Sequence, residues 1–132
     1  MTRRKLREEI FKVLFALDFY AREDFKKQID NYSEGFPDDI SKEDAAYIVR
    51  KSSDVAALIP EIDAQIDAVA ENWTTARMGK VELTVIRLAY YEMKHDSDIP
   101  ESVAINEAVE LAKKYGPDSA RAFVNGVLAK LV

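Results

Sequence analysis

Apolar residues recur at helical spacing along the whole chain, and this periodicity constrains the fold more than any other feature. In the first segment they follow steps of three and four residues: Leu6, Ile10, Val13, Leu14 and Leu17. Such spacing places the side chains on one face of an amphipathic helix. No stretch shows the strict apolar–polar alternation that is typical of a half-buried strand. The sequence therefore predicts an all-α fold.

The first helix also carries a second apolar row. Phe11, Phe15 and Phe19 follow one another at steps of four residues. A helix with two apolar faces either lies at the centre of its bundle or offers one face to a partner. An exposed aromatic row that mediates homodimerisation is therefore one hypothesis for this chain.

Glycine and proline divide the helical pattern. A long helical stretch begins at Ser41 and runs to about residue 72, and we expect Pro60 to kink or split it because proline lacks the amide hydrogen that a helix interior needs. Gly79 precedes the next helix, and Gly116-Pro117 ends the penultimate one.

These breaks predict six or seven helices in two small bundles. We expect one domain over residues 1–132, with an N-terminal helical subdomain of about 1–72 and a C-terminal helical subdomain of about 79–132. Trp73 lies beside the expected division, so we expect its large apolar ring to anchor the two halves to each other.

The composition argues against several classes of protein. The chain contains no cysteine and one histidine, which disfavours thiolate metal sites, disulfides and histidine-based catalytic triads. Its carboxylate pairs stand in expected loops, where solubility and helix capping explain them. We therefore expect no catalytic residues, no metal and no cofactor; an acid–base enzyme would need a pocket that holds two carboxylates with raised pKa values. No apolar run is long enough to cross a bilayer, so we expect no membrane association and a cytoplasmic location.

The net charge of −5 is unevenly distributed. Residues 1–12 carry five cations and two carboxylates, and residues 111–132 carry four cations and one carboxylate. The acidic side chains are concentrated between these ends. Two basic ends on an acidic body bind a polyanion if the ends meet in space; otherwise they are ordinary solvated helix ends.

The basic start is the more informative of the two ends. Arg3, Arg4, Lys5 and Arg7 stand within five residues, directly before or at a helix start. Clusters of this kind are typical of nucleic-acid contacts. The positive end of a helix dipole repels such cations, so helix stability does not account for them.

Four later stretches carry a resemblance to a known family. They are IRLAYYEM at 86–93, DIP at 98–100, AINEAVELAK at 104–113 and FVNGVL at 123–128. In their order and spacing they resemble the NusB family of bacterial transcription antitermination factors. The basic start, with Leu14-Phe15, is similar to the first helix of that family, so the resemblance covers essentially the whole chain.

The resemblance implies an all-helical RNA-binding protein. Such proteins recognise single-stranded boxA RNA together with the ribosomal protein NusE, within the antitermination complex of RNA polymerase on ribosomal RNA operons. The alternative is a helical protein–protein interaction or homodimerisation module without specific RNA binding.

The resemblance also implies a set of site residues. Those expected to contact RNA are Arg3, Arg4, Lys5, Arg7, Lys113, Lys114, Ser119, Arg121 and Phe123, of which Lys113, Lys114 and Arg121 are assigned by their charge. Those expected to contact the partner are Phe15, at a position where the family commonly has tyrosine, and Glu82. Three of these residues have a purely structural alternative: Phe123 and Phe15 fit apolar core positions, and Glu82 suits the first turn of a helix.

Overall fold

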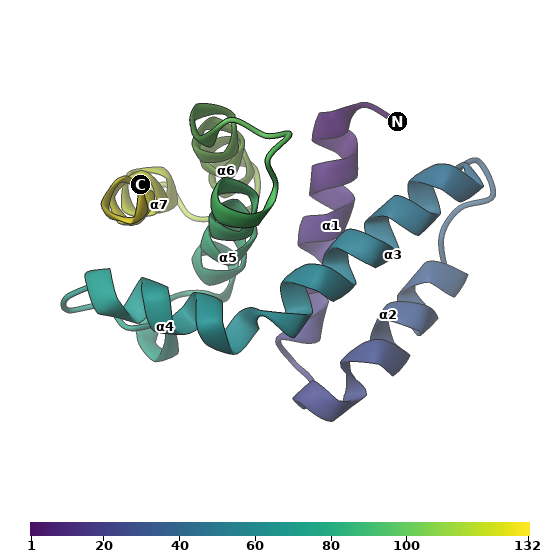
Figure 1. The fold of residues 1–132 in the computed structure, drawn as a ribbon, viewed down its shortest axis with the longest axis horizontal. Helices are drawn as coiled ribbons and strands as arrows, with labels where there is room; N and C mark the ends of the chain where they lie inside the picture. Colours follow the sequence, from purple (N-terminus) through teal and green to yellow (C-terminus); the bar gives the residue numbers. More distant parts are fainter. The chain divides into compact units, whose positions relative to one another are not determined.

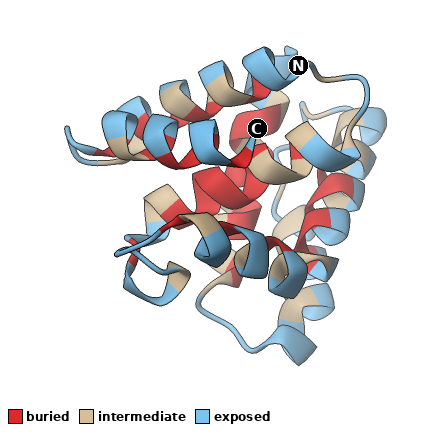
Figure 2. Ribbon diagram, turned by 60° about the vertical axis from the view of Figure 1, so that its left-hand side comes forward, coloured by how far each residue is buried: buried red, intermediate tan, exposed pale blue.

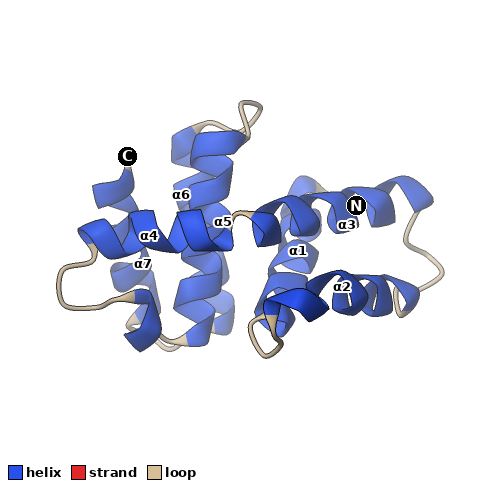
Figure 3. Cartoon of the chain, turned by 60° about the horizontal axis from the view of Figure 1, so that its bottom comes forward, coloured by secondary structure: helices blue, strands red, loops and turns tan.

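The computed structural model describes all residues, 1–132, and is entirely helical (Figures 1 and 3). Its seven α-helices are α1 (Arg3–Leu17), α2 (Phe25–Glu34), α3 (Lys42–Ala57), α4 (Ile59–Val69), α5 (Lys80–His95), α6 (Glu101–Tyr115) and α7 (Ala120–Leu131). Two single-turn 3-10 helices, η1 (Arg22–Asp24) and η2 (Thr75–Arg77), lie in the connections. The all-α prediction with six or seven helices is confirmed.

The chain forms two compact units, unit 1 (Met1–Ala57) and unit 2 (Leu58–Val132). The division therefore lies between α3 and α4, earlier than the 72–79 region that the glycine and linker pattern favoured. Pro60 splits the long helical stretch as expected, because α3 ends at Ala57 and proline is tolerated in the first turn of α4. The side chains of Ile62 and Ile66 are buried, and α4 packs against α5 and α7 in unit 2.

Unit 1 is built from α1, α2 and α3. The Thr2 hydroxyl caps α1 by accepting a hydrogen bond from the backbone N–H of Lys5 at 3.1 Å. The predicted apolar stripe of α1 is buried at its central positions: Ile10, Val13, Leu14 and Leu17. The core of unit 1 is completed by Ile29 from α2 and by Ile48 and Val55 from α3.

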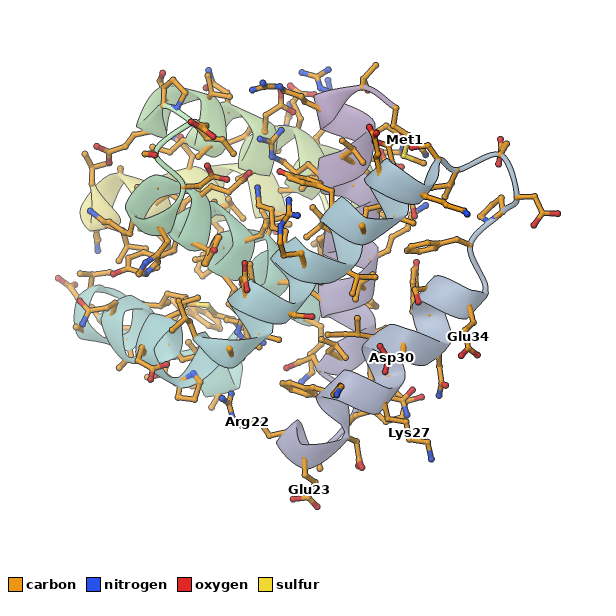
Figure 4. The ribbon with its side chains drawn as sticks, turned by 45° about the vertical axis from the view of Figure 1, so that its right-hand side comes forward. Met1, Arg22, Glu23, Lys27, Asp30 and Glu34 are labelled. Carbon is orange, nitrogen blue, oxygen red and sulfur yellow. The ribbon has the colours of Figure 1, made fainter.

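Charged groups hold both ends of α3. The Met1 ammonium group lies 3.0 Å from the carboxylate of Asp44 in the first helical turn. At the other end the Arg22 guanidinium donates hydrogen bonds to the carbonyl oxygens of Ala56 and Ala57, at 3.2 and 3.1 Å. Figure 4 labels Met1 and Arg22 on these two sides of unit 1. The last carbonyls of a helix lack partners within the helix, so Arg22 satisfies two of them.

Unit 2 is organised around α5. Every residue from Leu83 to Ala89 is buried, whereas the other helices carry buried residues on one side and exposed residues on the other (Figure 2). Helices α4, α6 and α7 all pack against α5. A partly buried ion pair joins α5 to α4: Arg87 Nε lies 2.8 Å from Asp63 Oδ1, and Nη2 lies 2.7 Å from Oδ2. None of the helices is both long enough and apolar enough to cross a membrane.

Candidate nucleic-acid interface

The first turn of α1 displays three exposed cations, Arg3, Arg4 and Lys5. Lys5 Nζ lies 3.3 Å from the Glu8 carboxylate and 3.7 Å from that of Glu9, so its charge is partly neutralised within the helix. Arg3 makes no ion pair. We call these three residues the α1 basic turn.

Arg7 has a different environment from the α1 basic turn. Its side chain is only 8% exposed, and it is already engaged in an interaction within the protein. The four cations that the sequence groups together are thus three surface residues and one buried residue, because Arg7 lies one turn further along α1 and on its buried side.

A second basic surface lies where α6 leads into α7. We define the α6–α7 corner by Lys113, Lys114, Ser119, Arg121 and Phe123. Lys113 and Arg121 are exposed and make no ion pair. Lys114 Nζ lies 5.5 Å from the centroid of the neighbouring Tyr115 ring. The Ser119 hydroxyl makes no capping hydrogen bond to α7 and is exposed. The corner therefore offers two unpaired cations and a hydroxyl to a ligand.

Gly116 fixes the turn within this corner. A Cβ atom at this position would lie 2.9 Å from the Ala112 carbonyl oxygen and 2.8 Å from Ala120 Cβ, both tighter than ordinary contacts. The same Cβ would lie 3.4 Å from Glu82 Oε1. The expected partner-binding residue Glu82 is thus located beside the turn that joins α6 to α7.

Glu82 also contacts the start of its own helix. It lies in the first turn of α5, and its carboxylate folds back over Gly79 so closely that any side chain at position 79 would collide with it. A carboxylate in this place is stabilised by the helix dipole. The half-buried Glu82 carboxylate therefore contributes to the start of α5, whatever it contacts outside the chain.

Phe123 is half-buried, so it belongs to neither of the two environments weighed for it, a closed core or an open surface. Its ring centroid lies 6.4 Å from that of Trp73, with the ring planes at 82°. Both residues belong to unit 2, and Trp73 is 52% exposed. The Trp73 ring therefore packs on Phe123 at the surface of unit 2, and its expected role as an anchor between the two halves stays a prediction.

The aromatic row that begins on α1 runs from a buried to an exposed end, and its last member, Phe19, lies just beyond the end of the helix at Leu17. Phe15 is half-buried, with its ring centroid 6.0 Å from that of Phe11 and 5.6 Å from that of Phe19. Phe11 is 3% exposed and Phe19 is 65% exposed. The outer end of the row is therefore accessible to a partner, and Phe15 stands midway.

Other titratable groups lie outside the α1 basic turn and the α6–α7 corner. No three acidic, histidine or cysteine side chains lie close enough together to hold a metal ion. His95 is exposed and stacks on Tyr91, with a centroid separation of 5.3 Å. In unit 1, burial, followed by the negative charge of Glu9, raises the pKa of the Tyr32 hydroxyl above its ordinary value.

Sequence reasoning assigned no binding role to three side chains around the Trp73–Phe123 pair. They are Trp73, Arg77 and Lys130, all in unit 2 and all exposed. A single tryptophan in a polar connection could have indicated a binding site, but the sequence analysis interpreted Trp73 only as an anchor between the two halves.

Comparisons with known proteins agree with the resemblance found in the motifs. The NusB family model matches residues 4–132. A transcription antitermination protein NusB of Agathobacter rectalis is 48% identical over 130 residues, which cover 98% of each chain. The solved NusB of T. maritima is 32% identical with a TM-score of 0.88, over 99% of this chain and 90% of that one. A chain from a solved complex of antitermination factors NusB and NusE with dsRNA is 26% identical with a TM-score of 0.74, over 99% and 97% of the two chains.

Proposed function

Because this chain belongs to the NusB family, we propose that it is a transcription antitermination factor that binds single-stranded boxA-type RNA together with NusE. The curated relatives are named as transcription antitermination proteins, which are not enzymes. A structural relative comes from a solved complex of antitermination factors NusB and NusE with dsRNA, which supports NusE and RNA as partners; the single-stranded form of the RNA is part of the proposal. The proposed setting is the RNA polymerase antitermination complex on ribosomal RNA operons, in the cytoplasm.

One observation carries the proposal for the surface of this chain. Arg3, Lys113 and Arg121 are exposed cations with no ion-pair partner, although acidic residues outnumber basic ones by 24 to 19. An unpaired cation on an acidic protein remains available to an external anion. Phosphate oxygens suit arginine in particular, since its planar guanidinium can donate two parallel hydrogen bonds.

The proposed mechanism divides affinity from specificity. Cations of the α1 basic turn and the α6–α7 corner neutralise phosphates, which supplies binding energy that does not depend on sequence. Unpaired bases stack on aromatic side chains, for which Phe123 at the corner is the candidate. Arg7, expected from the resemblance to contact RNA, is 8% exposed and so offers little surface for that contact.

Glu82 and Phe15 are the proposed contacts to the protein partner. Glu82 lies beside the Gly116 turn, so a partner that engages its carboxylate also lies next to the corner. Surface from the partner that continues the corner would increase RNA affinity, because the protein's own acidic body limits non-specific binding.

The second candidate function is a helical interaction module that forms homodimers. The exposed rings of Phe19 and Tyr20, at 65% and 48%, favour it. Sedimentation across a range of protein concentrations, with boxA-type or scrambled RNA and with NusE, separates the two candidates. The antitermination proposal predicts a chain that assembles with RNA and NusE whatever its own oligomeric state, whereas the alternative predicts dimers and no RNA preference.

The experiment that tests the proposal is fluorescence anisotropy of a labelled boxA-type RNA, with and without NusE. We expect tighter binding to this RNA than to a scrambled RNA of equal length and composition, and a further increase in affinity when NusE is present. Equal affinity for the two RNAs in the presence of NusE would contradict the proposal and leave the interaction module as the leading function.

A further inference from the structure

A cavity of about 280 Å³ lies in unit 2, one turn beyond the start of α7. Its walls are the segment that follows α4 and the exposed side of α7. The residues that matter for its chemistry are Glu71, Asn72, Trp73, Phe123, Gly126 and Lys130. It is open to solvent because Trp73, Gly126 and Lys130 are all exposed.

Two aromatic rings form the apolar part of this cavity. The Trp73 and Phe123 rings meet edge to face, with centroids 6.4 Å apart. The Arg77 guanidinium lies over the Trp73 ring, with its central carbon 5.3 Å from the ring centroid. The half-exposed Trp73 ring and the adjoining Phe123 ring leave apolar surface in water, and tryptophan is enriched at binding interfaces.

Gly126 has no structural reason to be glycine. It stands in the interior of α7, where glycine is among the least favourable residues, and no glycine in the chain has a positive φ. A Cβ atom added to it would meet nothing within 4 Å. The missing side chain therefore keeps the cavity open, as expected where a ligand approaches the helix backbone closely.

The polar groups around the rings favour an anionic ligand with a planar apolar part. Lys130 is exposed and makes no ion pair, and Arg77 adds a second cation, whereas Glu71 is the only carboxylate on the wall. The Asn72 side-chain amide supplies both a donor and an acceptor, which is the pattern needed to pair with the edge of a base.

Continuity along α7 identifies the ligand. Phe123 belongs to the α6–α7 corner, and Gly126 and Lys130 follow it on the same helix. We propose that this cavity accepts one unpaired nucleobase of the bound RNA, stacked on the Trp73–Phe123 pair, while Lys130 holds an adjacent phosphate. The inference rests on the proposed function and extends its RNA path to Trp73, Gly126 and Lys130.

The test uses a substitution that fills the cavity without disturbing the packing of the fold. In Gly126→Leu the new side chain enters open space, and the loss of a helix-interior glycine favours α7. Ala129→Leu is the matched control, since Ala129 is exposed on the same helix and does not line the cavity. Thermal melts of the two variants and of the unmodified protein establish that all three are folded.

Two readouts are taken on the same samples. The first is anisotropy with boxA-type RNAs in which one nucleotide at a time lacks its base. Loss of one stacked base should weaken binding of the unmodified protein by about 5-fold to 150-fold at a single position. The second is fluorescence of Trp73, the chain's one tryptophan, which base stacking should quench.

The inference predicts that Gly126→Leu binds the complete RNA as weakly as the unmodified protein binds the RNA without that base. In the same variant RNA should no longer quench the fluorescence of Trp73, and removal of the base at that RNA position should weaken binding no further. Ala129→Leu should behave as the unmodified protein. Specific RNA binding by Gly126→Leu at unchanged affinity would overturn the inference and leave the proposed function intact. A variant impaired only in binding NusE would overturn it in favour of a protein ligand. Failure of the proposed function is seen separately, in the unmodified protein's lack of preference for boxA-type RNA.

Discussion

The α1 basic turn and the lysines of the α6–α7 corner are both basic, but they stand at opposite ends of helices; the third cation of the corner, Arg121, lies in the first turn of α7. Arg3 and Arg4 lie at the N-terminus of α1, where the partial positive charge of the helix dipole repels them. Lys113 and Lys114 lie in the last turn of α6, where the dipole attracts them. Lysines at the corner can thus be explained by helix stability alone. The arginines of α1 cannot, so they are the stronger evidence for an external anion.

The two regions also differ in what holds their backbone. The start of α1 is set by a hydrogen bond from Lys5 N–H to the Thr2 hydroxyl, which is exposed. The corner is set by close packing around Gly116, with no room for a side chain. A substitution at Gly116 is therefore expected to affect folding as well as any binding at the corner.

The largest expected effect comes from crowding the corner. Gly116→Ala places its Cβ 2.9 Å from a backbone oxygen that cannot move alone, so we expect a loss of about 1–3 kcal/mol in the free energy of unfolding. Gly79→Ala is the matched control, because its new Cβ meets mainly the flexible Glu82 side chain, which can swing aside. Urea titrations measure both variants. Equal losses in the two would show that the corner is not held by its glycine.

A smaller effect tests the dipole argument directly. Arg3→Ala removes an unfavourable charge and should raise the free energy of unfolding, whereas Lys113→Ala removes a favourable one and should lower it, each by about 0.3–1 kcal/mol at low salt. Both side chains are exposed and make no ion pair, so no ion pair is lost with either. Denaturant midpoints at low and high salt provide the measurement. Shifts of the same sign would refute the contrast between the two regions.

Local signals in the sequence predicted most of the fold. The apolar stripe of α1, the break at Pro60 and the stop at Gly116-Pro117 each depend on residues a few positions apart, and all three are present. The division into units depends on where α4 packs. The burial of Ile62 and Ile66 against helices distant in sequence cannot be read from the local pattern. The expected boundary between the two parts of the chain therefore lies further along the chain than the boundary between the units.

The candidate site was predictable in its charges but not in its surroundings. Arg3, Lys113 and Arg121 are exposed, and they were identified from the clusters of basic residues, which can be seen in the sequence without knowledge of tertiary contacts. Burial of Arg7 and the packing of Trp73 on Phe123 depend on contacts between separate helices or connections. Gly126 gave no signal in sequence, since a helix glycine is informative only when the space above it is known to be empty.

The salt dependence of RNA binding tests the central claim most directly, that both basic regions neutralise phosphates. For about four phosphates of a single strand the slope of log affinity against log salt should be roughly −3. Arg3→Ala/Arg4→Ala and Lys113→Ala/Arg121→Ala should each flatten it by about 1.4, at roughly 0.7 per lost contact. Lys26→Ala/Lys27→Ala, which removes two exposed cations of α2, should leave it unchanged. A slope that stays the same in the first two variants, or flattens equally in all three, would contradict the account.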